Sequence, residues 1–513
     1  LHLLTPVART QTVTAACGED ASYPDDVVSD ERTLFDGGDF GDTPTQARPT
    51  QTQRVADYDD GEPVYQTLTE TTFDQFGRAL EVTDAEGNTT TTEYTSAVTG
   101  GPSALVTTTN ALGHTSTVEY DERSQPIAEI DANDNHTEMA YDPLGRMTDV
   151  WLADRDRDRG MGPSMRFEYH LSKDEPTVVT THTLNAKGDY TTSHQILDGM
   201  LRERQSQEPA PGGGRVLTDV FYDSRGNAII SREPYFNEDD PGGELFVVGN
   251  HDEIPRWSRT VYDGAGRTTD AIHMSRGVEQ FRTTTQHQGD RILVSEPEGG
   301  TGTTAITDVR GNTVELRKHH GPEAVGEYDS TFYTYTARSE LETVTDPDDN
   351  TWTYTYDLRG RKVTEDDPDT GHSEMVYDDL DRLVQTTDAR GETLATVYDE
   401  LGRQVELRDG DGDLRAQWTF DTVALGQPAT STRFEDGQAY TTRVMGYDPV
   451  NRPRAHQISV PSTEGELAGN YLFRTTYNPD GSVRSTVTPA AGSLPSEVTV
   501  HGYDDLGNPT TLS

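Results

Sequence analysis

The stretch Tyr356-Asp357-Leu358-Arg359-Gly360-Arg361 is one copy of a phrase that recurs along this chain. Between residues 335 and 403, four tyrosines follow one another at steps of 21 residues, and an aspartate comes directly after three of them. These tyrosines are Tyr335, Tyr356, Tyr377 and Tyr398. A further aspartate, at Asp346, Asp367 and Asp388, stands eleven residues after each of the first three tyrosines. A fixed period of this length indicates a repeat architecture.

Each repeat predicts two strands and two turns. A short run of β-forming residues follows each Gly-Arg pair, then comes a turn rich in Asp and Gly, and a second run ends at the next tyrosine. The second run is clearest at residues 351–356, where Trp352, Tyr354 and Tyr356 alternate with threonines. Because side chains alternate along a strand, we expect the three aromatic residues on one face and the threonines on the other.

The phrase Tyr-Asp-x-x-Gly-Arg is typical of a turn with its anchors. An aspartate can accept hydrogen bonds from the backbone N–H groups of its own turn, and a glycine adopts a left-handed conformation without steric cost. We therefore assign structural turn roles to three copies of the phrase. Their residues are Tyr141, Asp142, Gly145, Arg146, Tyr356, Asp357, Gly360, Arg361, Tyr398, Asp399, Gly402 and Arg403.

These repeats resemble the YD repeats of the RHS family, which includes bacterial polymorphic-toxin shells and wall-associated proteins. The resemblance runs from about residue 73 to about residue 508. It implies an all-β fold, a spiralling antiparallel β-sheet of YD-repeat hairpins that forms a hollow shell or part of one. It also implies a secreted or cell-surface location and, as partner, a C-terminal toxin domain of the same parent chain.

The spacing of the repeats divides the chain into four parts within one continuous repeat body. Residues 1–56 are the least repetitive and predict an irregular β segment or a partial repeat, with strands at residues 3–7 and 12–14. Residues 57–150 carry regular repeats, residues 151–330 carry repeats stretched by insertions, and residues 331–513 carry repeats that are most regular at 335–403. We expect the insertions at residues 208–214 and 237–243 to be surface loops. Both ends look cut from a longer parent.

The composition excludes some classes of partner. The chain has 42 basic against 90 acidic residues, a net charge of −48 that repels nucleic acid and anionic lipid. The longest apolar runs are only a few residues long, so we expect no membrane insertion by this segment. The single cysteine, Cys17, excludes an intramolecular disulfide. The low content of aliphatic residues predicts a thin wall without one large core.

The sequence contains no motif of the common hydrolases, zinc enzymes or nucleotide-binding proteins, so we expect no enzyme and no catalytic residues. Asp409, Asp411 and Asp413 alternate with glycines and have the oxygen spacing with which a calcium loop begins. Phe420 stands where such a loop carries its glutamate, so a solvated turn is the stronger interpretation and calcium the weaker one. No other cofactor or metal is indicated.

Two functions remain open at this stage. The resemblance predicts a structural shell segment that encloses and delivers a C-terminal toxin in competition between bacteria. The alternative is a cell-surface adhesin that binds glycans, with Trp352, Tyr354 and Tyr356 as stacking residues. Packing between repeats is the more ordinary role for these aromatic side chains, because the tyrosine recurs in every unit.

Overall fold

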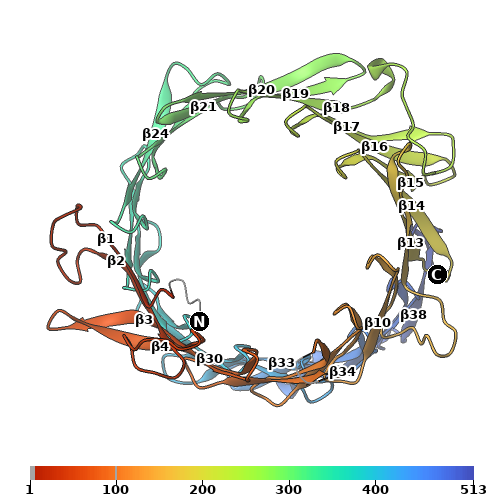
Figure 1. Cartoon of the computed structure of the whole chain (residues 1–513). Helices are drawn as coiled ribbons and strands as arrows, with labels where there is room; N and C mark the ends of the chain where they lie inside the picture. Colours follow the sequence, from red (N-terminus) through yellow and green to blue (C-terminus); the bar gives the residue numbers. More distant parts are fainter. Residues whose placement is uncertain (1–5, 97, 99–100) are drawn as a thin grey trace. The chain divides into compact units, whose positions relative to one another are not determined.

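The computed structural model describes residues 6–96, 98 and 101–513. Over these residues the chain forms 39 β-strands and two short 3-10 helices, so the fold is all-β as the repeats predict. Wherever the register is defined, strands that follow one another in the chain pair antiparallel, and the colours of Figure 1 follow the same order.

The chain divides into two compact units. Unit 1 comprises Leu1–His136 and Tyr333–Leu472, and unit 2 comprises Thr137–Phe332 and Phe473–Ser513. Each unit therefore contains two bands of strands from distant parts of the sequence. The predicted division at residues 56, 150 and 330 concerns the repeat spacing and stays a prediction.

The strands of the first band of unit 1 are β1 (Arg9–Val13), β2 (Val27–Phe35), β3 (Pro49–Asp59), β4 (Glu62–Phe73), β5 (Ala79–Asp84), β6 (Thr89–Ser96), β7 (Ser103–Thr109), β8 (Thr115–Tyr120) and β9 (Pro126–Ile130). Those of its second band are β25 (Leu341–Thr345), β26 (Thr351–Tyr356), β27 (Lys362–Asp367), β28 (Gly371–Tyr377), β29 (Leu383–Thr387), β30 (Thr393–Tyr398), β31 (Gln404–Asp409), β32 (Leu414–Phe420), β33 (Pro428–Glu435), β34 (Gln438–Tyr447) and β35 (Pro453–Val460), with the 3-10 helix η2 (Ser462–Leu467).

The strands of the first band of unit 2 are β10 (His136–Tyr141), β11 (Met147–Trp151), β12 (Met165–His170), β13 (Thr177–Leu184), β14 (Tyr190–Leu197), β15 (Glu203–Pro209), β16 (Arg215–Tyr222), β17 (Ala228–Asn237), β18 (Trp257–Tyr262), β19 (Thr268–Ser275), β20 (Val278–Gln288), β21 (Arg291–Ser295), β22 (Thr303–Thr307), β23 (Thr313–His319) and β24 (Tyr328–Tyr335), with the 3-10 helix η1 (His251–Glu253). Those of its second band are β36 (Gly469–Tyr477), β37 (Val483–Thr488), β38 (Glu497–Tyr503) and β39 (Pro509–Leu512).

The turn of the repeat forms as its sequence predicts. The Oδ1 atom of Asp357 accepts hydrogen bonds from the backbone N–H groups of Arg359, at 2.9 Å, and Arg361, at 3.0 Å. Gly360 has a φ of +77°, a conformation that favours glycine. The Arg361 side chain also turns back, and its Nε atom donates to Oδ2 of Asp357 at 2.7 Å. One carboxylate therefore organises the whole turn.

The same arrangement recurs in the other predicted turns. Asp142 and Asp399 each accept two backbone N–H groups and the Nε atom of the arginine four residues later. The turns that open eleven residues after the tyrosine are built alike: Asp346 accepts the backbone N–H groups of Asp348 and Asn350. Both turns of the unit are thus aspartate turns.

Threonines join neighbouring strands on the face opposite the tyrosines. The hydroxyl groups of Thr345 and Thr351 lie 3.1 Å apart, and those of Thr387 and Thr393 lie 3.3 Å apart. In β26, Thr351 and Thr355 are exposed, whereas Trp352, Tyr354 and Tyr356 are half-buried, as is Thr353. Pairs of this kind stabilise a sheet that has little apolar packing.

Little of the chain forms a hydrophobic core. The one cluster of buried apolar residues among the described residues consists of Leu217, Tyr235, Ile254 and Trp257 in unit 2. The expectation of a thin wall therefore holds in the described part of each unit. Cys17 is exposed.

Three local expectations need comment. The strand expected at residues 3–7 falls mainly on residues 1–5, which lie outside the described residues. The expected loop at 208–214 is wrong in its first two residues, because β15 continues to Pro209 and only residues 210–214 form a turn. The loop expected at 237–243 is irregular from residue 238, because Asn237 still belongs to β17, and part of it lies against the sheet: the N–H group of Gly242 donates to Oε1 of Gln207 at 3.0 Å.

We predict that Asp357→Ala lowers the free energy of unfolding of this region by about 1–3 kcal/mol, because two turn N–H groups lose their acceptor and Arg361 loses its anchor. Urea denaturation followed by intrinsic fluorescence measures the change. Asp411→Ala is the matched control, since this exposed aspartate does not open a turn. Equal effects of the two substitutions would contradict the role given to Asp357.

Candidate functional site

The candidate functional surface is the set of turn arginines that connects the repeats. The guanidinium carbon of Arg361 lies 5.1 Å from the ring centroid of Tyr377, the tyrosine of the following repeat. Its Nη1 atom donates to the backbone carbonyl of Asp378 at 2.9 Å. The hydroxyl of Tyr377 in turn donates to the carbonyl of Lys362 at 2.8 Å. Each repeat is thus linked to the next by one arginine and one tyrosine.

This link recurs along the chain. The tyrosine hydroxyl donates to the backbone carbonyl of the residue five positions after the turn aspartate of the preceding repeat. Examples are Tyr398 to Leu383 and Tyr169 to Met147. Arginine guanidinium groups lie over the aromatic ring of the following repeat in several pairs, which are Arg78 with Tyr94, Arg146 with Tyr169, Arg202 with Tyr222, Arg382 with Tyr398 and Arg403 with Phe420. The sequence predicts turns at these arginines but does not indicate that they contact the aromatic ring of the following repeat.

A second set of turn residues joins the two bands of unit 1, and we call it the seam. Arg359 donates through Nη1 to Oε1 of Gln66 at 2.6 Å, and its side chain is only 5% exposed. Arg382 pairs with Glu86 at 2.6 Å, and Nε of Arg338 donates to the carbonyl of Val27 at 2.8 Å. These partners lie between 293 and 311 residues apart in the sequence.

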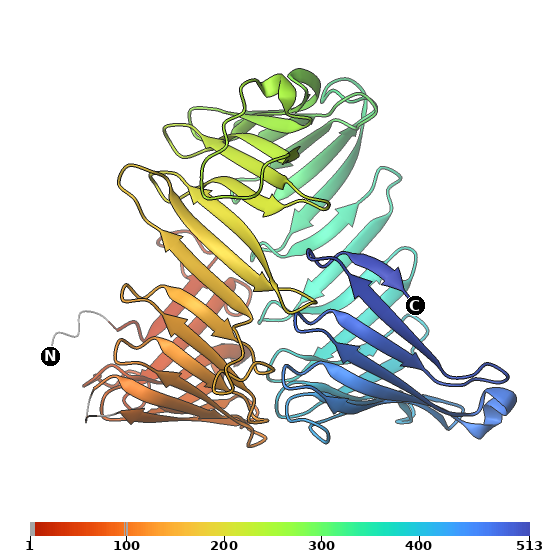
Figure 2. The same ribbon diagram turned by 90° about the vertical axis from the view of Figure 1, so that its right-hand side faces the viewer.

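The seam continues along unit 1. The backbone N–H of Leu425 donates to Oδ1 of Asn133 at 2.7 Å, and Nδ2 of Asn133 donates to the Leu425 carbonyl at 2.9 Å. Figure 2 shows the red and orange strands of the first band beside the teal and blue strands of the second. In each of these contacts at least one partner lies in or beside a turn, so turn residues of one band reach the strands or turns of the other.

Unit 2 has a seam of the same kind, with Asp505 at its centre. The backbone carbonyl of Asp505 accepts Nδ2 of Asn185 at 3.2 Å and the hydroxyl of Thr191 at 2.7 Å. Its carboxylate pairs with Nζ of Lys187 at 2.5 Å. Lys187 is one of only four lysines in the chain.

Hydrogen bonds lower the pKa of three turn carboxylates, those of Asp142, Asp263 and Asp378. The side chain of Arg146 lowers the pKa of Asp142, and the backbone N–H of Arg267, followed by its side chain, lowers the pKa of Asp263 to about 2. In Asp378 burial acts in the opposite direction, but hydrogen bonds from Arg382 outweigh it and the pKa is lowered. The turns therefore depend on charged aspartate.

The structure does not bring the candidate calcium ligands together. Oδ1 of Asp409 accepts the backbone N–H groups of Asp411 and Asp413, and its Oδ2 atom pairs with Nε of Arg415 at 2.9 Å. Across residues 6–96, 98 and 101–513, no three His, Cys, Asp or Glu side chains are arranged to hold a metal ion. A calcium site at these aspartates stays a prediction.

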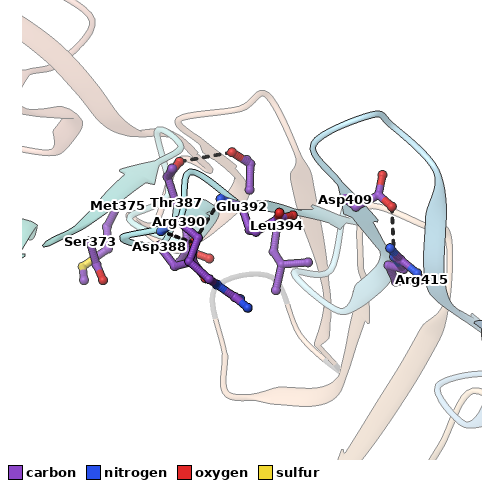
Figure 3. Close-up of a pocket in the computed structure, with 11 residues that line it drawn as sticks. Ser373, Met375, Thr387, Asp388, Arg390, Glu392, Leu394, Asp409 and Arg415 are labelled. Carbon is purple, nitrogen blue, oxygen red and sulfur yellow. Dashed lines mark hydrogen bonds and ion pairs between the residues drawn. The ribbon is translucent and has the colours of Figure 1, made fainter. Parts of the chain in front are cut away.

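Asp409 and Arg415 also line a cavity of about 460 Å³ in unit 1, shown in Figure 3. A second ion pair there joins Nη2 of Arg390 to Oδ2 of Asp388 at 2.6 Å. Met375 contributes an apolar part of the wall. Since both arginines are paired with aspartates inside the cavity, its chemistry suggests no particular ligand.

The three candidate glycan-stacking residues take part in the wall itself. The hydroxyl of Tyr356 donates to the carbonyl of Leu341 at 2.8 Å, and Nζ of Lys362 lies 5.3 Å from the ring centroid of Tyr354. Trp352 and Tyr354 are half-buried. Glycan binding by Trp352, Tyr354 and Tyr356 stays a prediction that no contact in the structure favours.

The RHS Repeat family model matches this chain at residues 335–372 and 377–414, the most regular part of the sequence. No curated protein sequence matches the chain. Among the described residues, no helix has the length and apolar character needed to cross a bilayer.

Solved structures share the fold. The crystal structure of TcdB2-TccC3 is similar with a TM-score of 0.73 and 15% sequence identity over 94% of this chain and 31% of that chain. The crystal structure of TcdB2-TccC3-Cdc42 is similar with a TM-score of 0.73, 15% identity and coverage of 94% and 33%. A Photorhabdus luminescens Tc holotoxin pore with a substitution in TccC3 is similar with a TM-score of 0.70, 14% identity and coverage of 95% and 33%. The present chain spans about a third of the length of these chains.

Removal of the seam arginines should loosen both bands of unit 1. In the double variant Arg359→Met and Arg382→Met, we expect faster amide hydrogen exchange in the strands around Gln66 and Glu86, with local stability lower by about 1–2 kcal/mol. Hydrogen exchange with mass spectrometry measures this effect. Arg390→Met is the matched control, since this side chain is 79% exposed. If exchange changed only in the band that carries the substitutions, the seam would not couple the bands.

We also predict a loss of stability in acid. Since the pKa of Asp263 in the folded chain lies near 2, below the ordinary value of 3.8, its contribution is complete above pH 3.8 and is lost as the pH falls through 2. Urea midpoints measured from pH 7 to pH 2 should stay level at first and then fall below about pH 4. Asp263→Asn, which cannot form the ion pair with Arg267, should make the acid part of this curve shallower. An unchanged curve would contradict the role of this carboxylate.

Residues 335–372 and 377–414 thus match the RHS Repeat family model, the repeats there are built on aspartate turns, and the chain shares its fold with TcdB2-TccC3 over 94% of its length.

Proposed function

We propose that this chain is the wall segment of a shell that encloses a C-terminal toxin of the same parent polypeptide and delivers it in competition between bacteria. The observation that carries the proposal is the fold shared with TcdB2-TccC3 over 94% of the chain. A related crystal structure is described as TcdB2-TccC3 without its hypervariable C-terminal region, so that protein carries a variable region at its C-terminus. A secreted or cell-surface location is part of the proposal.

The seams support an enclosing role. A wall made of separate hairpins would leave gaps between its bands, whereas contacts such as Arg382 with Glu86 and Lys187 with Asp505 join the two bands within each unit. The repeat links and seams use charged and polar groups, so the wall needs little apolar surface that would adhere to an unfolded polypeptide. The net charge of −48 favours retention of a basic polypeptide over an acidic one.

Confinement can be tested with a reporter. We expect that an unstructured, basic reporter segment fused after Ser513 is cleaved by trypsin at least about tenfold more slowly than the same segment alone, because the wall limits its access to protease. Mass spectrometry of the digestion products gives the rates. In the seam variant with Arg359→Met and Arg382→Met, the protection should decrease.

The control is the same reporter fused after Ser513 of the Arg390→Met variant, which leaves the seam contacts in place. Cleavage of the fused reporter at the rate of the free reporter would overturn enclosure by this segment. Protection that does not depend on the seam would show shielding by the fusion alone.

A further inference from the structure

The insertion between β17 and β18 in unit 2, residues 238–255, lies against one face of the sheet, and we call it the strap. Ile254 of the strap belongs to the buried apolar cluster, and Phe246 and Val248 of the strap pack against this cluster. Apart from the short helix η1, the strap has no regular secondary structure and pairs with no strand in the described register. Backbone pairing with the sheet therefore does not explain how the strap is held.

Two buried glutamines of β15 hold the strap by its backbone. Gln205 donates through Nε2 to the carbonyl of Phe246 at 2.9 Å and accepts the N–H of the same residue at 2.9 Å. Gln207 donates to the carbonyl of Glu244 at 2.8 Å and accepts the N–H of Gly242 at 3.0 Å. The contacted residues alternate along the strap as they do along an extended strand. The side-chain amides thus replace a neighbouring strand.

Hydrogen bonds to other residues of the sheet also orient both side-chain amides. Nε2 of Gln207 donates to Oε1 of Gln205 at 2.8 Å, and Nη1 of Arg215 donates to Oε1 of Gln207 at 2.8 Å. Nε2 of Gln205 also donates to Oδ1 of Asp219 at 2.9 Å. Each amide therefore uses both of its N–H groups, and its oxygen accepts two hydrogen bonds. Both glutamines are fully buried, so their orientation is set by these partners.

Arg215 on this face of the sheet also contacts two side chains of the strap. Nη2 of Arg215 pairs with Oδ2 of Asp239 at 3.1 Å, and the guanidinium carbon of Arg215 lies 4.9 Å from the ring centroid of Phe246. The Arg215 side chain is 9% exposed, so this cation is largely removed from water. An acidic residue followed seven residues later by an aromatic residue satisfies both contacts. The contacts with the backbone between these two residues do not depend on the identity of the side chains.

We propose that this face of β15, β16 and β17 is a binding site for an extended peptide, occupied in this chain by its own strap. When the strap lifts, the same face binds a segment of another polypeptide that carries an acidic residue and, seven residues later, an aromatic one. The glutamines recognise the peptide backbone at alternate residues, and Arg215 recognises the two side chains. The inference concerns unit 2 alone and stands independently of the proposed enclosure.

The first test uses a chain in which a Gly-Ser linker replaces residues 239–250 and a fluorescently labelled peptide with the sequence of residues 237–250. We expect saturable binding by fluorescence anisotropy, weakened at least about tenfold by Gln205→Leu with Gln207→Leu, because the backbone groups lose their partners. Gln286→Leu, an exposed glutamine of β20, is the matched control. A peptide N-methylated at the positions of Gly242 and Phe246 should bind at least about tenfold more weakly.

Binding that survives both N-methylation and the glutamine substitutions would overturn the proposal, and so would no binding by a strap-less chain that keeps its β circular dichroism. If the strap-less chain does not fold, the same binding experiment is done with the full chain carrying Val248→Ser. This substitution weakens the packing of the strap, so the labelled peptide should be able to displace it. No uptake by that variant overturns the proposal. In the unsubstituted chain, the N–H groups of Gly242 and Phe246 should exchange slowly, and they should exchange faster after Gln205→Leu with Gln207→Leu.

Discussion

The carboxylate of the turn aspartate is the constraint on which the rest of the structure depends. In Asp357 a single side chain accepts two backbone N–H groups and the Nε atom of Arg361, which positions this arginine over Tyr377 of the following repeat. An isolated exposed ion pair contributes little to stability. Here the turn holds the arginine, whose other nitrogen donates to the carbonyl of Asp378. Repetition of such nearest-neighbour links lets a chain with almost no hydrophobic core remain folded.

The seam reuses the same turns for a second purpose. Arg382 is held by Asp378 of its own turn through Nε at 2.6 Å, and its Nη2 atom reaches Glu86 in the other band. One guanidinium therefore stabilises a turn, stacks on Tyr398 and joins two bands. Arginine suits this position better than lysine, because a planar group with five donors can serve several acceptors at once. The seam needs no strand pairing, so the bands of each unit are held by side chains.

Sequence periodicity was sufficient to predict the repeats but not the contacts between residues that are distant in the sequence. The period of 21 residues located the strand Thr351–Tyr356 and the aspartate turns, because these depend on residues close in sequence. The contact of Arg359 with Gln66 spans 293 residues and has no periodic counterpart in the first band. A partial signal existed, since Arg338 and Arg359 hold the same position in consecutive turns. In the sequence, nothing distinguishes Gln205 and Gln207 from other polar residues. Only the structure shows that they bind the backbone of the strap.

The apolar cluster found among the described residues lies at a gap in the repeat links. Tyr222 and Tyr262 are 40 residues apart, and the turn that follows Tyr222 has Asn227 where turns such as that of Asp357 have arginine. Gln125 and Asn508 hold this position in two further turns. The tyrosine contact survives there, because the hydroxyl of Tyr262 donates to the carbonyl of Ala228 at 3.0 Å, but asparagine has no guanidinium to stack on the ring. The strap and its buried cluster lie at this step of unit 2. At this step, apolar burial and the glutamine contacts add stability where the arginine link between repeats is missing.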